Sequence, residues 1–284
     1  MHNGIAGIDH IVIAVRDLAR AGMRWGRLGF TLTPRGRHLG QGTANCCVMF
    51  AGDYIELLGL VERDRDVHGL EAFLARREGP MSVAFAPSGS AEEAGAALAR
   101  RGLHPSPPRA LARQLELPEG TVVPRFSLVA LPSEETPGLD SFVCGHLTPE
   151  LLRRPQWLMH PNGAIGLNSV HILVDETAPL LPAYDRLFGI HEVTTTDAVA
   201  RVRTGRQGLV FATPDDFLIM HPGIELDPNF LLPGIAALEL TVASRERTAD
   251  YLTQWQIGFD EMPDGTLSVP AREANGTVIL FSEG

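Results

Sequence analysis

An internal repeat constrains the fold of this chain more than any other feature of its sequence. Residues 10–30 resemble residues 169–189 at a constant offset of about 159 positions. In both copies an apolar strand leads into a helix, a glycine and a new strand, and we expect Asp17 and Asp175 to cap the two helices. The chain is therefore built from copies of one supersecondary unit.

A second pair of copies starts with the strands 82–85 and 237–242. The helix of the first begins at the Ser90 capping box, and the helix of the other runs from Ser244 to a stop at Gly258. In all four units the last strand follows a turn rich in glycine, proline or aspartate. The four turns, each with the strand residue after it, are 51–53 before Tyr54, 138–141 before Phe142, 214–216 before Phe217, and 275–276 before Val278.

Four βαβββ units predict an α+β fold, in which the units pair into two cup-shaped halves of curved, mixed β-sheet with helices outside. The expected halves are residues 1–150 and 165–284, the second of them partly degenerate. The segment 147–165 between them contains three prolines and is expected to be a connector.

The charge balance excludes several classes of partner. A net charge of −10 and a pI near 5.5 give no basic surface for nucleic acid or for an anionic membrane. The first residues lack the pattern of a signal peptide and no apolar stretch is long enough to span a bilayer, so the expected location is cytoplasmic. All basic residues are arginines, which excludes a Schiff-base lysine and a P-loop lysine.

Two residues interrupt apolar strands with groups that bind metals. His10 lies in the run 8–15 and Glu56 in the run 54–58. Burying an imidazole and a carboxylate in strand interiors is costly unless something coordinates or hydrogen-bonds them. Together, His10 and Glu56 suit Fe²⁺, Mn²⁺, Zn²⁺ or Ni²⁺. Taken alone, His10 would be interpreted as a hydrogen-bonded core histidine.

With these residues in these strands, the chain resembles the glyoxalase-like domain proteins of the vicinal oxygen chelate superfamily, which includes glyoxalase I, extradiol dioxygenases and bleomycin-resistance proteins. The resemblance covers nearly the whole chain and implies a cup around one divalent metal ion, which chelates two adjacent oxygens of a substrate. It also implies ligands from the first and fourth strands of both units. The motifs that carry it are His10, His38, Gly42–Asn45, Tyr54–Leu57 and His160–Ala164.

The second unit departs from that pattern. Met81 or Ser82 stands where a histidine is expected, and Cys144 stands opposite Glu56. Because strand side chains alternate, His146 shares the face of Cys144, so either could supply a third metal ligand. For Cys144 a substrate contact and a buried apolar role are the alternatives.

Further candidates surround the first cup. Thr43 and Asn45 share one face of a strand, and the resemblance implies hydrogen bonds to substrate, although a role in the turn fits equally. His38 could act as an acid or base at the mouth of the cup, together with Glu56 as the catalytic carboxylate. Arg125 could bind a substrate carboxylate or lie on an exposed strand face.

The second half lacks the first pair of ligands, since its equivalents of His10 and Glu56 are Ser169 and Ile219. Three residues of matching parity lie nearby and would form a displaced facial triad, or else a polar network. They are His171, His221 and Glu239.

The leading hypothesis is a metal-dependent enzyme, a lyase, isomerase or dioxygenase, which acts on a small molecule with vicinal oxygens. Its rival is a metal-free protein that sequesters a small hydrophobic or planar ligand, as bleomycin-resistance proteins do. A third, weaker reading makes one half a structural or dimerisation partner. A homodimer is compatible with four units but not required by them.

Overall fold

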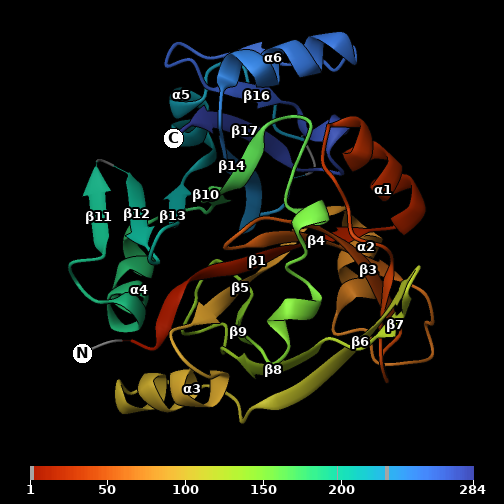
Figure 1. Ribbon diagram of the computed structural model, residues 1–284. Helices are drawn as coiled ribbons and strands as arrows, with labels where there is room; N and C mark the ends of the chain where they lie inside the picture. The colour runs from red at the N-terminus through yellow and green to blue at the C-terminus, as the bar shows by residue number, and fades with distance from the viewer. Residues whose placement is uncertain (1–2, 197, 228–229) are drawn as a thin grey trace.

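The computed structural model describes residues 3–196, 198–227 and 230–284, which form two mixed β-sheets with helices on their outer sides (Figure 1). The first sheet has nine strands, in the order β2-β3-β4-β1-β5-β9-β8-β6-β7. A further pairing of β2 with β6 closes this sheet into a barrel. Its strands are β1 (Ile5–Val15), β2 (Gly36–His38), β3 (Thr43–Met49), β4 (Tyr54–Leu60), β5 (Gly79–Pro87), β6 (Arg109–Leu117), β7 (Gly120–Val122), β8 (Arg125–Ala130) and β9 (Ser141–His146).

The second sheet has eight strands in the order β11-β12-β13-β10-β14-β17-β16-β15 and stays open. In each sheet the first strands of two units pair antiparallel at the centre, β1 with β5 and β10 with β14. The sheet's strands are β10 (Ala164–Leu173), β11 (Val193–Thr196), β12 (Val199–Arg203), β13 (Gly208–Ala212), β14 (Gly234–Val242), β15 (Asp260–Glu261), β16 (Leu267–Val269) and β17 (Val278–Glu283). The predicted α+β fold with two curved, mixed sheets is confirmed.

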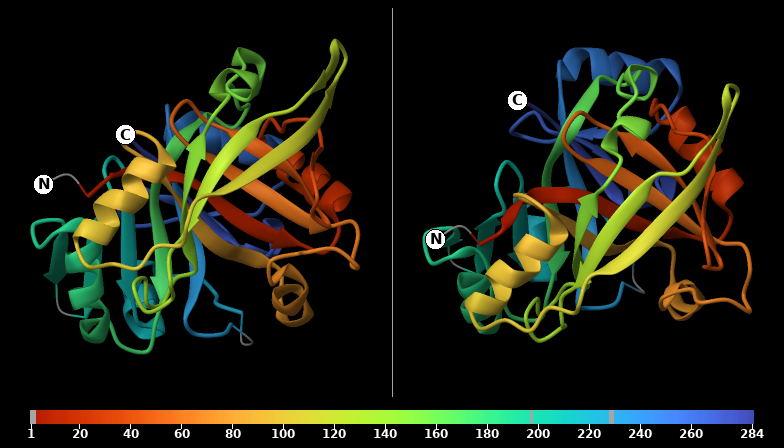
Figure 2. Two further views of the ribbon diagram at one scale, coloured as in Figure 1. Left: turned by 90° about the horizontal axis from the view of Figure 1, so that it is seen from below. Right: turned by 60° about the horizontal axis from the view of Figure 1, so that its bottom comes forward.

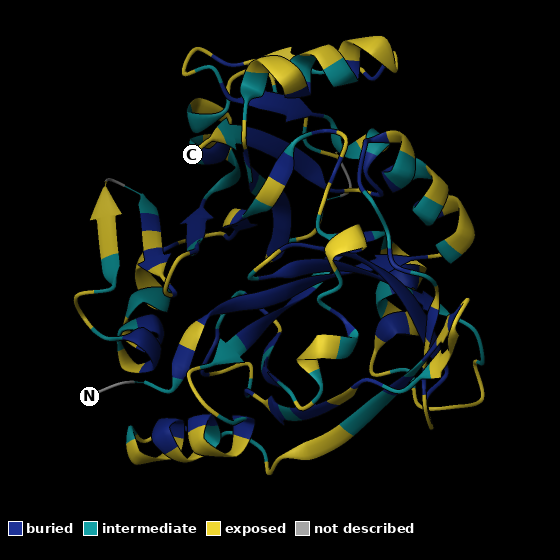
Figure 3. Ribbon diagram, viewed as in Figure 1, coloured by how far each residue is buried: buried dark blue, intermediate teal, exposed yellow. Residues whose placement is uncertain are grey.

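The helices lie outside the sheets, with polar outer faces and buried inner faces (Figure 3). As predicted, Asp17 caps the first helix by accepting from the amide of Arg20, and Ser90 forms a capping box with Glu93. The helix cap predicted at Asp175 is wrong, because a 3₁₀ turn at 178–180 follows it and the fourth helix starts only at Leu181. The helices are α1 (Leu18–Arg27), α2 (Leu70–Arg76), α3 (Ala91–Arg100), α4 (Leu181–Phe188), α5 (Pro214–Met220) and α6 (Arg245–Gln254).

The strand expected to start at Phe217 is instead the helix α5. Thr213 accepts a hydrogen bond from the amide of Asp216, and Pro214 occupies the first helical position, where its missing N–H costs nothing. The fourth strand of this unit is therefore β13. Its Val210, rather than Ile219, is the counterpart of Glu56.

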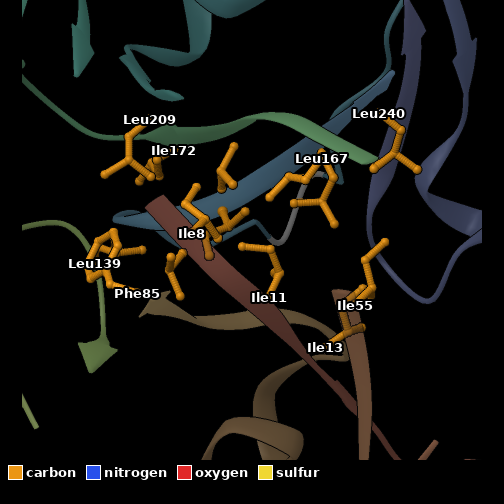
Figure 4. Close-up of a cluster of buried hydrophobic side chains, with 14 of the residues drawn as sticks. Ile8, Ile11, Ile13, Ile55, Phe85, Leu139, Leu167, Ile172, Leu209 and Leu240 are labelled. Atoms are coloured by element: carbon orange, nitrogen blue, oxygen red, sulfur yellow. The ribbon is translucent and has the colours of Figure 1, made fainter. Parts of the chain in front are cut away.

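The two sheets share one hydrophobic core (Figure 4). Ile8 and Ile11 of β1 and Phe85 of β5 pack on one side, and Leu167 and Ile172 of β10 pack on the other. The side chains on this face of β1 are buried in the core. The other face of the strand therefore lines the interior of the barrel (Figure 2). Of the described helices, none is long and apolar enough to cross a membrane.

Polar side chains also tie the two sheets together. The ring of His160, in the connector, accepts from the amide of Thr31 and donates to the carbonyl of Met49. The carboxylate of Asp53 accepts from the amide of Leu167 and from the side chain of Gln207. The motif at 160–164 thus acts here as a structural link between the halves.

Candidate functional site

The barrel encloses a cavity of about 660 Å³, a volume typical of small-molecule sites. Its walls are largely apolar, with Leu111, Phe126, Leu128 and Phe142 among them. Polar lining residues lie on β1, β2, β3 and β4, and others lie on β5, on β6 and in loops, among them Ser82, Arg113 and Asp140. Six of the residues that the sequence singled out line this cavity: His10, His38, Thr43, Asn45, Glu56 and Cys144.

A β-bulge on β1 positions His10. The pairing of β1 with β5 shifts register between Ile8 and His10, so Asp9 and His10 both turn into the barrel while Ile8 stays in the core. Nδ1 of His10 donates to Oδ2 of Asp9 at 2.7 Å. This fixes the orientation of the ring and leaves Nε2 facing Oε2 of Glu56, 3.5 Å away.

His38 faces the other oxygen of Glu56. Its Nδ1 lies 2.8 Å from Oγ1 of Thr43, and its Nε2 lies 3.7 Å from Oε1 of Glu56. Burial lowers the pKa of His38 to about 4, the charge of Arg113 adds to this effect, and Glu56 opposes it. At neutral pH the ring is therefore an uncharged imidazole.

Asn45 completes the polar group. Its amide nitrogen donates to Oε1 of Glu56 and lies 3.3 Å from Nε2 of His38. Its own Oδ1 is buried and has no partner among the described residues. Burial alone would raise the pKa of Glu56, but His10, His38 and Asn45 together hold it below its ordinary value, so the carboxylate is ionised.

A second polar cluster lies directly behind His10. Nε2 of His146 donates to Oδ2 of Asp9 at 3.0 Å, and Arg153 lies 3.9 Å from the other oxygen. Burial alone would raise the pKa of Asp9, but His146 and His10 hold it well below its usual range. His146 therefore lies beside Asp9 rather than beside Glu56, the position in which a third ligand was expected.

Two sets of donors could hold a metal ion. Asp9, Cys144 and His146 form the only group of three among the described residues whose ligand atoms all lie within 4.8 Å of one another. However, burial raises the pKa of the Cys144 thiol well above its usual value, and Oδ2 of Asp9 already accepts from two imidazoles.

The set around Glu56 is spaced more widely than 4.8 Å, but its donors suit a metal ion better. Nε2 of His10, Nε2 of His38 and the Glu56 carboxylate match the two-histidine, one-carboxylate donor set of divalent iron and its neighbours. The Asp9 carboxylate on Nδ1 of His10 is the outer-shell partner that metal-bound histidines usually have. These donors also face an open cavity, which a substrate could enter.

Arg125 is not in the cavity. Of the two roles expected for it, the structure shows the exposed strand face, since its side chain is exposed on β8 and lies outside the cavity. Arg113 of β6 is buried and lines the cavity instead. The signal was present in the sequence, since Leu111, Arg113 and Leu115 alternate on one face of a strand and the arginine interrupts an apolar series.

The second half forms a polar network around Ser169. Oγ of Ser169 donates to Glu239 at 2.6 Å and lies 3.0 Å from Nε2 of His171, whose Nδ1 faces Nε2 of His221 at 3.4 Å. Burial and the neighbouring His171 lower the pKa of His221 to about 4. The predicted triad of His171, His221 and Glu239 does not bring three ligand atoms within 4.8 Å of one another.

The fold has relatives among solved structures. A hypothetical protein from Staphylococcus aureus superposes with a TM-score of 0.68 at 12% identity, covering 98% of this chain and 99% of that one. A 4-hydroxymandelate synthase variant from Streptomyces coelicolor gives 0.57 at 12% identity, covering 99% and 92%. A fusion of a xylose isomerase-like TIM barrel with a 4-hydroxyphenylpyruvate dioxygenase gives 0.58 at 12% identity, covering all of this chain and 50% of that one.

Among curated proteins, none matches this chain. The family model of the glyoxalase-like domain matches residues 8–188, a segment that contains all the barrel strands except the start of β1, and every residue of the site around Glu56. With its paired βαβββ units and with more than half of its length in that match, the chain belongs to the glyoxalase-like domain family of the vicinal oxygen chelate superfamily.

Proposed function

We propose that the protein is a metal-dependent enzyme whose single divalent ion is held in the barrel by His10 and Glu56, with His38 as the third protein ligand. The observation that carries the proposal is the approach of Nε2 of His10 to Oε2 of Glu56. His10 lies between two carboxylates, with Nδ1 2.7 Å from Asp9, and apart from their own approach neither its Nε2 nor Oε2 of Glu56 has another partner among the described side chains. An imidazole nitrogen and a carboxylate oxygen that meet at the wall of a cavity form a pair that a divalent cation could bind in place of a shared proton.

The substrate would be a small molecule with two adjacent oxygens, and the reaction that of a lyase, isomerase or dioxygenase. A divalent ion supplies Lewis-acid polarisation of such oxygens. The chain's residues orient and shield them: Asp9 fixes the ring of His10, Thr43 fixes the ring of His38, and Asn45 holds Glu56. In this proposal His38 is a metal ligand rather than the acid or base that its sequence position suggested. It takes the role of third protein ligand, for which His146 was expected.

Metal analysis tests the proposal directly. Protein purified without chelators should carry about one equivalent of Fe, Mn, Zn or Ni, and His10→Ala and Glu56→Ala should each lose it. His104→Ala is the matched control, because its ring is 87% exposed and does not line the cavity. The metalloenzyme proposal would be contradicted if the parent protein carried no stoichiometric metal and gained no melting temperature when these ions were added.

One observation favours the rival, a metal-free protein that sequesters a small ligand. The Asn45 amide already satisfies one oxygen of Glu56 without any cation, and the remaining cavity wall is rich in aromatic and aliphatic side chains. The same metal analysis separates the two proposals. A metal-free parent that is stabilised by planar apolar ligands would support the rival.

The wider setting is part of the same proposal. A small-molecule ligand, rather than nucleic acid or membrane, agrees with the net charge of −10 and the enclosed cavity. We place the protein in the cytoplasm, where its three buried, free thiols would stay reduced. A homodimer stays a prediction.

A further inference from the structure

Arg113 is a buried cation on the wall of the cavity. Its residue is only 2% exposed, and it lies on β6 at the seam where the barrel closes, paired directly with His38 of β2. Nη1 donates to Sγ of Cys47 at 3.1 Å, and Nε is buried without a partner among the described residues. The guanidinium therefore uses few of its five donors.

No described carboxylate forms an ion pair with Arg113 within 4.0 Å. Glu56 interacts with this charge only from beyond that distance, and its oxygens are engaged by His10, His38 and Asn45. The one polar partner of Arg113 is uncharged, since burial raises the pKa of the Cys47 thiol to about 11. A buried guanidinium without a directly paired anion is unfavourable unless something else pairs with it.

The barrel makes room for this side chain. Gly36 of β2 lies opposite Leu115 of β6, and a Cβ built on it would stand 2.5 Å from Cδ of Arg113 and 2.7 Å from Oδ1 of Asn45. Both contacts are too close for any residue other than glycine without rearrangement. The seam thus holds the arginine stem in one place, with its head toward the cavity.

We propose that Arg113 is the anchor for a carboxylate on the molecule that occupies the cavity. A guanidinium binds a carboxylate through two parallel N–H donors, and this pairing would satisfy both its charge and its unused donors. The ligand class is a small carboxylic acid with an apolar or aromatic body, which matches walls formed by Leu111, Phe126 and Phe142.

The anchor deepens the proposed function, because it names the substrate class of the same cavity. Arg113 stands beside His38 in the strand pairing and bonds Cys47, which is itself paired with Glu56. A carboxylate on Arg113 would therefore hold the rest of the ligand against the metal-binding end. If Glu56 binds a divalent ion, its negative charge offsets part of the charge of that ion. The positive charge of Arg113 is then not balanced by Glu56.

Salicylate and salicylamide are suitable probes, because they differ in the charge of one substituent. We expect the protein to bind salicylate at least roughly tenfold more tightly than salicylamide by titration calorimetry at pH 7, and Arg113→Met to abolish this preference. Arg113→Met should also keep or raise the melting temperature of the ligand-free protein, because it removes an unpaired buried charge while filling the same space.

The matched control is Arg109→Gln, which removes the same charge from an exposed arginine at the cavity. It should retain the preference for salicylate. The proposal would be overturned if the parent bound both probes equally, or if Arg109→Gln lost the preference for salicylate to the same extent as Arg113→Met. A lowered melting temperature or a failure to fold in Arg113→Met would also overturn it. The titrations are run both on protein as purified and after dialysis against chelator, so that absence of a metal and absence of an anion site give different results.

Discussion

Asp9 and His10 are consecutive in the chain, yet their side chains meet, with Oδ2 of Asp9 2.7 Å from Nδ1 of His10. In a regular strand they would point to opposite faces, and Asp9 would lie in the apolar core between the sheets. The bulge between Ile8 and His10 brings both into the barrel. His10 is thereby held in one orientation, with Nε2 directed at Glu56.

Asp9→Asn should weaken metal binding by about 10- to 100-fold, because the amide no longer offers a charged acceptor to Nδ1 of His10. Asp140→Asn is a suitable control, since Asp140 also lines the cavity but has no contact with His10. Competition against a chromophoric chelator gives the two affinities. Equal affinities in Asp9→Asn and the parent would remove Asp9 from the site.

Gly36→Ala should destabilise the protein by about 1–3 kcal/mol, because its Cβ would clash with the stem of Arg113 at the barrel seam. Gly208→Ala, on β13 of the open sheet, meets nothing closer than 3.7 Å and should cost less. Urea unfolding measures both. If the two variants lose the same stability, strand propensity rather than the clash explains the effect.

Asp53 makes the stability depend on pH. Burial raises the pKa of Asp53 from 3.8 to about 6, although Leu167 and Gln207 donate to it. Because the folded state holds its proton more tightly than the unfolded state, this group's contribution is present below pH 3.8 and is lost as the pH rises through 6. Between pH 5 and pH 7 the loss is about 1 kcal/mol.

Asp53→Asn should abolish this part of the pH dependence. The quantity to compare is the difference in unfolding free energy between pH 5 and pH 7, in the parent and in the variant, since any constant cost of a mismatched hydrogen bond to Gln207 cancels. An unchanged difference would show that Asp53 is ionised throughout this range.

Much of the fold was predictable because internal repeats and helix caps are local patterns in the sequence. The strands at 10 and 169 and the cap at Ser90 follow from local patterns, and the structure has them. The helix α5 was missed because its signal lies in Thr213 and Pro214, a cap followed by proline, and these residues also read as a turn.

Part of the site was predictable because polar residues interrupt short apolar strands. His10, His38, Asn45 and Glu56 share the inner face of neighbouring strands and do lie together. Asp9 was missed because a bulge cannot be read from alternation. The contact between His146 and Asp9 could not be predicted for the same reason.

The second half offers a last prediction, that it binds no metal. Ser169 replaces His10 and Val210 replaces Glu56, so the two positions that would face each other hold a hydroxyl and an isopropyl group. The nearby histidines are already engaged, with His171 between Ser169 and His221.

We therefore expect the double variant His171→Ala/His221→Ala to retain the parent's bound metal, whereas His10→Ala loses it. Emission spectroscopy on the purified proteins gives both stoichiometries. Because Ser169 and Glu239 would both lose their contact with His171, the double variant should still lose stability, so folding is checked by circular dichroism first. A folded double variant that carries less metal than the parent would relocate the ion to the second half, and the network around Ser169 would then need to open in order to coordinate it.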